Sequence, residues 1–103
     1  MKKRSYYCKY SIGLKYATDE RIKNVNAILD KLLSPRLCSE IKIESTEVYS
    51  TNTVFEGLCY KNTFVLKGPK RDLILFSNYF LKAFNQFSIK YSSYEVGKIS
   101  RKC

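Results

Sequence analysis

Residues 6–16 alternate between two sets of side chains, and this alternation constrains the fold more than any other feature of the chain. A spacing of two over such a length predicts a β-strand with one buried and one exposed face. The aromatic content of the run favours the same conformation. The residues predicted to share the buried face are Tyr6, Cys8, Tyr10, Ile12, Leu14 and Tyr16. Those predicted to share the exposed face are Tyr7, Lys9, Ser11, Gly13 and Lys15.

The segment that follows carries the signals of a helix. Thr18 can cap its start, and Asp19 and Glu20 fall in its first turn, where negative charge stabilises the helix dipole. Ser34-Pro35 predicts its end, because the residue before a proline is disfavoured in the α conformation. The apolar residues at helical spacing are Ile22, Val25, Ile28 or Leu29, and Leu32.

The middle of the chain is less regular. Residues 36–52 predict one short strand, with a turn at 50–53. Residues 54–60 and 63–67 predict two further strands. We expect these two to be joined at Lys61-Asn62, because asparagine tolerates the left-handed conformation of tight hairpins.

A second helix is predicted after Gly68-Pro69, with the proline at its first helical position. Its apolar residues step by three or four and predict a buried face. Residues 88–96 fit either a continuation of this helix or a last strand. We expect residues 97–103, like residues 1–4, to be basic and flexible. The predicted buried stripe is Leu73, Phe76, Phe80, Phe84 and Phe87.

These elements predict one α+β domain spanning residues 1–103. A right-handed crossover lays the first helix on the sheet, and the second helix falls on the same face. The expected architecture is a ferredoxin-like antiparallel sheet with two helices packed on one face. The opposite face of the sheet is then open.

The charge is unevenly distributed along the chain. The net charge is +10, but residues 18–60 hold seven of the nine acids and sum to −2, which leaves +12 on the remainder. Such a chain suits a polyanionic partner. It has no histidine to act as a base near neutral pH, and its glycines form no phosphate-binding motif. We therefore expect a non-catalytic nucleic-acid-binding protein without a cofactor.

Cys8, Cys38, Cys59 and Cys103 lack the close spacing of a metal site. The basic start of the chain is not followed by the apolar run of a secretory signal, which favours reduced thiols and a cytoplasmic protein. Its apolar stretches are shorter than the ~18–20 residues that a membrane span requires, so we expect no membrane partner.

Two places in the sequence could bind anions. Gly68-Pro69-Lys70-Arg71 puts two cations at a helix start, although solvated charges beside a turn are the alternative. The outer side of the first strand interleaves aromatic rings with cations, as base-stacking surfaces do, although packing or a dimerising edge would also use these tyrosines. The predicted nucleic-acid-binding residues are Lys2, Lys3, Arg4, Tyr7, Lys9, Lys15, Lys70 and Arg71.

Three short motifs occur in order along the chain. Residues 32–35 are Leu-Leu-Ser-Pro, residues 62–66 are Asn-Thr-Phe-Val-Leu, and residues 78–81 are Asn-Tyr-Phe-Leu. In this the chain resembles the dimerising small subunit of the KEOPS complex, which makes threonylcarbamoyladenosine in transfer RNA. Ile74 departs from that family, which usually has an arginine at this position. The resemblance implies a homodimer that docks onto a protein partner of a larger complex and helps to hold tRNA.

Two other classes of function fit the same residues. The lysine-, asparagine- and tyrosine-rich composition is typical of an AT-rich genome, cellular or viral. A small viral or mobile-element protein that inhibits a host nucleic-acid enzyme could have this fold, because fold does not fix function. A small ribosomal or RNA-packaging protein would carry similar charge.

Overall fold

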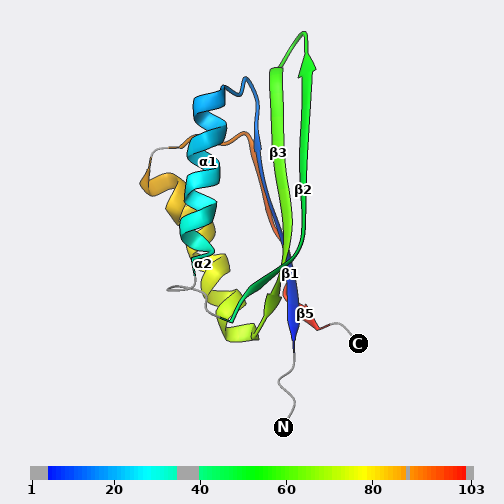
Figure 1. Ribbon diagram of the computed structural model, residues 1–103, viewed down its shortest axis with the longest axis vertical. Helices are drawn as coiled ribbons and strands as arrows, with labels where there is room; N and C mark the ends of the chain where they lie inside the picture. The colour runs from blue at the N-terminus through cyan, green and yellow to red at the C-terminus, as the bar shows by residue number, and fades with distance from the viewer. Residues whose placement is uncertain (1–4, 35–39, 88, 102–103) are drawn as a thin grey trace.

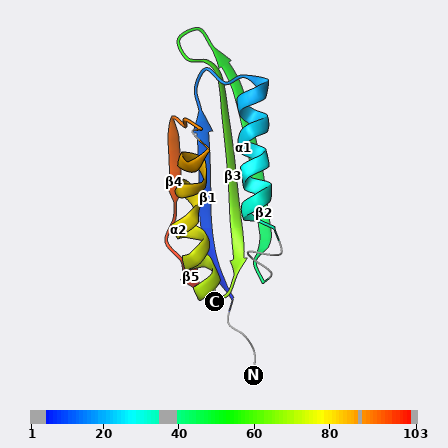
Figure 2. The same cartoon turned by 90° about the vertical axis from the view of Figure 1, so that its left-hand side faces the viewer.

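A computed structural model of the chain describes residues 5–34, 40–87 and 89–101. Two helices cover one face of a single antiparallel sheet, and the other face is open (Figures 1 and 2). The strand order is β2-β3-β1-β4, and β5 pairs with β1 on the same edge as β4. The elements are β1 Tyr6–Leu14, α1 Asp19–Leu32, β2 Lys42–Thr53, β3 Gly57–Gly68, α2 Lys70–Gln86, β4 Ser93–Val96 and β5 Ser100–Arg101.

This arrangement confirms the predicted ferredoxin-like α+β fold. Strand β1 lies in the interior of the sheet, between β3 and β4. Thr18 caps α1 as predicted, because its Oγ1 accepts a hydrogen bond from the Arg21 backbone N–H at 3.2 Å. The predicted second helix is α2, and in the undecided segment 88–96 the residues Ser93–Val96 form β4, while residue 88 lies outside the described residues.

The core lies between the helices and the sheet and is rich in aromatic rings. The Tyr10 ring is fully buried, 4.9 Å from Phe76 and 5.4 Å from Phe64 between centroids. Its hydroxyl forms a hydrogen bond of 2.7 Å with Ser77 Oγ, which satisfies the one polar atom of this ring. The predicted stripe on α2 is confirmed except at Phe87, which follows the last helical residue and is 52% exposed.

The predicted inner face of β1 is confirmed from Cys8 to Leu14 but not at Tyr16. The predicted exposed face is wrong at Ser11 and Gly13, which are buried where β4 pairs with β1. The strand ends at Leu14, and Tyr16 adopts a left-handed conformation with φ of 52°. Its side chain is 64% exposed, and its hydroxyl donates a hydrogen bond to the Phe55 carbonyl at 2.5 Å. The turn in the backbone therefore ends the alternation two residues before the sequence pattern does.

The β2–β3 hairpin differs from the prediction. The turns expected at residues 50–53 and at Lys61-Asn62 are both wrong, because these residues lie within long strands. The chain turns at residues 54–56, and Gly57 supplies the positive φ of 61° that the turn needs. Asn62 pairs with Ile12 and Val48, so ladder hydrogen bonding overrides its local preference for a turn.

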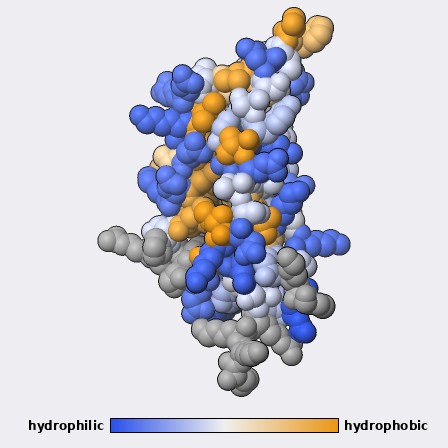
Figure 3. Space-filling model, turned by 45° about the vertical axis from the view of Figure 1, so that its right-hand side comes forward, coloured by the Kyte–Doolittle hydropathy of each residue, from blue (hydrophilic) through white to orange (hydrophobic). Residues whose placement is uncertain are grey.

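The hairpin projects beyond the helices and ends in an apolar tip. The molecule is elongated, with extents of 54 × 27 × 16 Å, and the tip lies at one end of the long axis (Figure 1). Val54 and Phe55 are 97% and 86% exposed, and hydrophobic colour is visible where this turn projects (Figure 3). The Tyr16 and Ala17 backbone N–H groups donate to the Glu56 and Leu58 carbonyls, which fastens the hairpin to the body.

The ends of two other segments also differ from expectation. Pro69 is the extended N-cap of α2 rather than its first helical residue. The segment 97–103, expected to be a flexible tail, lies against β1 as far as Arg101. The Gly97 N–H donates to the Lys9 carbonyl at 2.7 Å, and the Cys8 thiol donates to the Gly97 carbonyl at 3.2 Å. The predicted arm at residues 1–4 lies outside the described residues.

Neither α1 nor α2, the helices in the described part of the chain, has the length and apolar character needed to cross a membrane.

Candidate nucleic-acid interface

Successive side chains along each strand point alternately into the core and onto the open face of the sheet. Tyr7 and Lys9 lie on this face of β1, as predicted. The register places Lys67 opposite Tyr7, and the Lys67 Nζ lies 5.8 Å from the centroid of the Tyr7 ring. Lys42 on β2 pairs in turn with Lys67. A tyrosine and two lysines from three adjacent strands therefore meet at one end of the open face.

The start of α2 lies at this same end of the molecule. Tyr6 pairs with Gly68 on one side and with Arg101 of β5 on the other. The Lys70 Nζ lies 6.0 Å from the Tyr6 ring centroid. We call this cluster the basic end; its members are Lys42, Lys67, Lys70, Arg71 and Arg101.

Acidic side chains reduce the net positive charge of the basic end. Asp72 occupies the first turn of α2, where its carboxylate suits the positive end of the helix dipole. Glu40 and Glu44 lie just before and within the nearby start of β2. The cluster remains cationic, because five cations outnumber these three acids.

Lys15 lies away from the basic end. It follows Leu14, which pairs with Tyr60 at the opposite end of the β1–β3 ladder. Its Nζ forms a salt bridge of 3.2 Å with Glu56 Oε1. The structure thus separates Lys15 from the other described members of the predicted site, which are Tyr7, Lys9, Lys70 and Arg71. Lys2, Lys3 and Arg4 lie outside the described residues.

The Glu56 carboxylate accepts hydrogen bonds from two side chains. The bond from Lys15 is the main reason that the pKa of Glu56 is lowered from its ordinary value of 4.5. The Cys59 thiol donates to Glu56 Oε2 at 3.4 Å. Desolvation, followed by the bond to Glu56, raises the pKa of Cys59 from 9.0. This cluster fastens the base of the hairpin turn and keeps the Cys59 thiol protonated.

The uneven charge of the sequence becomes a separation in space. The described part of residues 18–60 forms α1, β2 and the start of β3. Helix α1 and strand β2 lie on one side of the molecule, while α2, β4 and β5 lie on the other (Figure 2). The described residues outside 18–60 carry ten lysines and arginines but only two acids, Asp72 and Glu95. Lys82 and Lys90 are among these cations and lie away from the basic end. The basic end therefore holds only part of the excess positive charge.

Three open-face lysines were missed by sequence reasoning. Lys42, Lys61 and Lys67 share this face with Tyr7 because the register places them there. For Lys61 and Lys67 the available signal was the alternation through residues 60–67, in which Tyr60, Asn62, Phe64 and Leu66 share the face opposite the lysines. Reading Asn62 as a turn interrupted that pattern.

The cysteines do not form a metal site in the described part of the chain. Cys8 is buried and Cys59 is partly buried, and both are free thiols. Among the described residues, no group of three or more histidine, cysteine, aspartate or glutamate side chains is placed to hold a metal ion. Cys38 and Cys103 lie outside the described residues.

Comparisons with known proteins identify the fold class alone. No protein-family profile and no curated protein sequence matches the chain. Among solved structures, the de novo designed protein Foldit4 superposes with a TM-score of 0.63 at 12% identity, over 96% of this chain and 99% of that one. A protein designed on this architecture has no inherited function. This similarity is therefore evidence only of how the helices pack on the sheet.

Two natural proteins share the architecture over part of their length. An unknown protein from Galdieria sulphuraria has a TM-score of 0.53 at 12% identity, over 97% of this chain and 50% of that one. LarC2 is the C-terminal domain of a cyclometallase involved in the synthesis of the NPN cofactor of lactate racemase. It has a TM-score of 0.51 at 13% identity, over 96% of this chain and 58% of that one.

Proposed function

We propose that this chain is a non-catalytic protein that binds the backbone of a nucleic acid through the basic end and the adjoining open face of the sheet. The observation that carries the proposal is that cations from β2, β3, α2 and β5 gather at one end of the molecule. Lys42 and Lys67 lie with Tyr7 on the open face, and Lys70 and Arg101 lie with Tyr6 on the helix side of the same sheet end. Cations that neutralise phosphates supply most of the affinity of such binding.

The composition of the open face supports binding without strong sequence preference. Lys67 lies beside the Tyr7 ring, and this pairing offers one group for a phosphate and one for a base. Lys9 is exposed on the same strand, one outward-facing position further along. A flat face with a tyrosine ring beside lysines favours single-stranded or looped segments, whose bases can stack, over base-edge readout in a duplex groove.

Transfer RNA is the first nucleic acid to test, because the three motifs resemble the KEOPS subunit. On the same basis we propose that the chain is a cytoplasmic homodimer that joins a larger complex. Strand β2 supports the dimer: it is a sheet edge of twelve residues, and all but one of them are exposed. Such an edge presents unpaired backbone groups to a second strand.

The test is the salt dependence of tRNA binding, measured by fluorescence polarisation. We expect the affinity of the unmodified chain to fall steeply with salt. The triple variant Lys67→Ala, Lys70→Ala, Arg71→Ala should bind at least about tenfold more weakly, and its slope of log K against log salt should be lower by about 2 to 3.

The matched control is Lys23→Ala, Lys82→Ala, Lys90→Ala, which removes the same charge away from the basic end. If both triple variants lose equal affinity, the net charge and not the basic end causes binding. An affinity of the unmodified chain that stays constant between low and high salt would contradict the proposal itself.

A further inference from the structure

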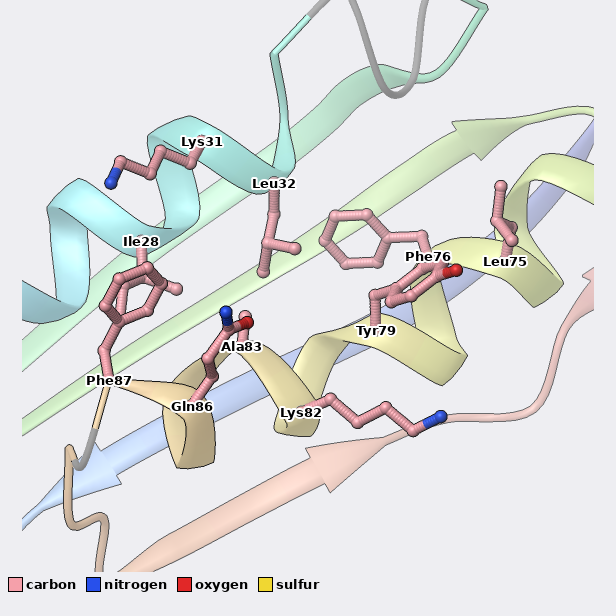
Figure 4. A pocket seen from close by; sticks show the side chains of 10 residues that line it. All are labelled: Ile28, Lys31, Leu32, Leu75, Phe76, Tyr79, Lys82, Ala83, Gln86 and Phe87. Carbon is pink, nitrogen blue, oxygen red and sulfur yellow. The ribbon is translucent and has the colours of Figure 1, made fainter.

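A second surface lies on the other layer of the molecule, between α1 and α2. The two helices leave an apolar groove with a volume of about 390 Å³ (Figure 4). Ile28 and Leu32 of α1 face Phe76 and Ala83 of α2 across it. Because the open sheet face and this groove belong to opposite layers, a ligand in the groove does not cover the open face.

The groove is bordered by apolar side chains that the core does not need. Leu75, Tyr79 and Phe87 are 46%, 53% and 52% exposed, although α2 already buries a complete stripe against the sheet. Leu75, Tyr79 and Ala83 follow one another at intervals of four residues, so they form a second apolar stripe on the helix. Contiguous exposed apolar surface of this kind marks an interaction site.

The charges at the groove are all of one sign. Lys31 lines it from α1, and its Nζ lies 4.9 Å from the Phe87 ring centroid. Lys82 lines it from α2, with its Nζ 6.0 Å from the Tyr79 ring centroid. No aspartate or glutamate is among the described residues that line the groove. Two copies of this surface placed face to face would therefore bring like charges together, which disfavours a second copy as the occupant.

We propose that the groove binds an acidic amphipathic helix of a partner protein. Apolar residues of that helix, spaced three and four apart, would lie against Leu75, Tyr79 and Ala83, above the buried Leu32 and Phe76 at the floor of the groove, as in other helix-in-groove complexes. Carboxylates on its two flanks would pair with Lys31 and Lys82, one on each side. Helices pack at about 8–10 Å between axes, so a third helix resting on two others contacts both of them.

This inference goes beyond the proposed function and does not rest on it. A chain with both surfaces would join a nucleic acid to an acidic protein partner. Loss of tRNA binding and loss of peptide binding are separate results, because they are measured with different probes on different layers of the fold.

The probe is a synthetic helical peptide of about five turns, ~18 residues, with leucines at positions i, i+3, i+4 and i+7 and glutamates elsewhere. Two control peptides are a leucine–lysine peptide with the same spacing and a scrambled leucine–glutamate peptide. Titration calorimetry gives the affinity, and methyl NMR shifts give the location. We expect the leucine–glutamate peptide to bind at least about tenfold more tightly than either control, with shifts at Ile28, Leu32 and Leu75.

The variant Lys31→Glu, Lys82→Glu should reverse the preference, so that the leucine–lysine peptide binds more tightly. Its matched control, Lys23→Glu, Lys90→Glu, changes the charge equally outside the groove and should keep the original preference. The inference is overturned if both variants weaken leucine–glutamate binding equally, if the scrambled peptide binds as well as the ordered one, or if the shifts lie outside the groove. Thermal unfolding of each variant shows that the fold is retained.

Discussion

At the scale of single residues, Arg21 connects three parts of the chain. Its Nη1 donates to the Lys15 and Tyr16 carbonyls at 3.0 and 3.1 Å, and its Nη2 donates to the Lys90 carbonyl at 2.9 Å. The guanidinium thereby ties the β1–α1 loop to the segment before β4. Among the described cations, Arg21 has a structural role that its position in the sequence does not indicate.

We expect Arg21→Lys to lower the free energy of unfolding by about 1–2 kcal/mol. A lysine ammonium is a point charge and does not reproduce the planar fork that reaches three carbonyls. Urea denaturation measures the change. Lys23→Ala, a change two residues away on the same helix, is the control and should stay within about 0.5 kcal/mol. Equal stability of Arg21→Lys and the unmodified chain would show that these hydrogen bonds contribute nothing.

Glu56 gives a prediction for the effect of acid. Its pKa is lowered in the folded chain, mainly by the hydrogen bond from Lys15. The folded state therefore favours the carboxylate, and the resulting stabilisation is present above the ordinary value of 4.5 and is lost as the pH falls through the lowered value. Below pH 4.5, Glu56→Gln should therefore lose less folding stability than the unmodified chain, because the variant lacks this titrating carboxylate.

Urea denaturation at a series of pH values, from neutral to about pH 3, tests this. The matched control is Glu95→Gln, which makes the same chemical change on β4. The difference in stability between the unmodified chain and Glu56→Gln should narrow as the pH falls. A difference that stays constant over the whole range would contradict the role assigned to the Lys15–Glu56 pair.

At the scale of elements, β2 is the least protected part of the sheet. Ile43 and Val48 lie on its helix side, opposite Leu66 and Asn62, yet they are 52% and 57% exposed. The helices therefore leave this strand uncovered. The charged residues of β2, which are Lys42, Glu44 and Glu47, and the register irregularity between Ile43 and Ser45 lie in the first half of the strand, where they limit pairing at the edge. Residues 48–53 carry no charge and leave the second half of the edge open to a partner strand.

We expect the chain to dimerise through β2, and light scattering over a range of concentrations measures this. Val48→Lys adds a charge to the exposed edge and should shift the equilibrium towards monomer. Lys98→Ala, outside β2, is the control and should leave the equilibrium unchanged. A monomer at high concentration would contradict both the edge pairing and the dimer that the KEOPS resemblance implies.

The elements differ in how far the sequence predicts them. Helices α1 and α2 carry uninterrupted periodicity, so local pattern and tertiary burial agree there. In β1 the alternation predicts the inner face, but it does not predict that Ser11 and Gly13 on the other face are buried. The β2–β3 hairpin lacks this agreement, because its turn contains Val54 and Phe55 while the typical turn residue Asn62 lies inside a strand. Side chains at an exposed tip have no packing requirement to satisfy. The position of the turn therefore depends on Gly57 and on the fit of the strands to β1.

The candidate interface depends on that register. Tyr7 and Lys9 were predictable, because the alternation of β1 alone fixes the face they occupy. Lys67 joins Tyr7 only when β3 pairs along its full length, and Arg101 joins Tyr6 only because β5 forms. Sequence patterns describe one element at a time, whereas this cluster draws on four.

At the scale of the whole molecule, the order in which the strands are synthesised matters. Strand β1 comes first in the chain but lies between β3 and β4, both of which follow it. During translation, the apolar side of β1, with Tyr10 and Ile12, therefore stays without its neighbours until most of the chain has left the ribosome. Contacts between such distant segments form slowly, and exposed strands are prone to aggregate. The interior position of β1 thus delays the burial of Tyr10 and Ile12 until β3 and β4 have been synthesised.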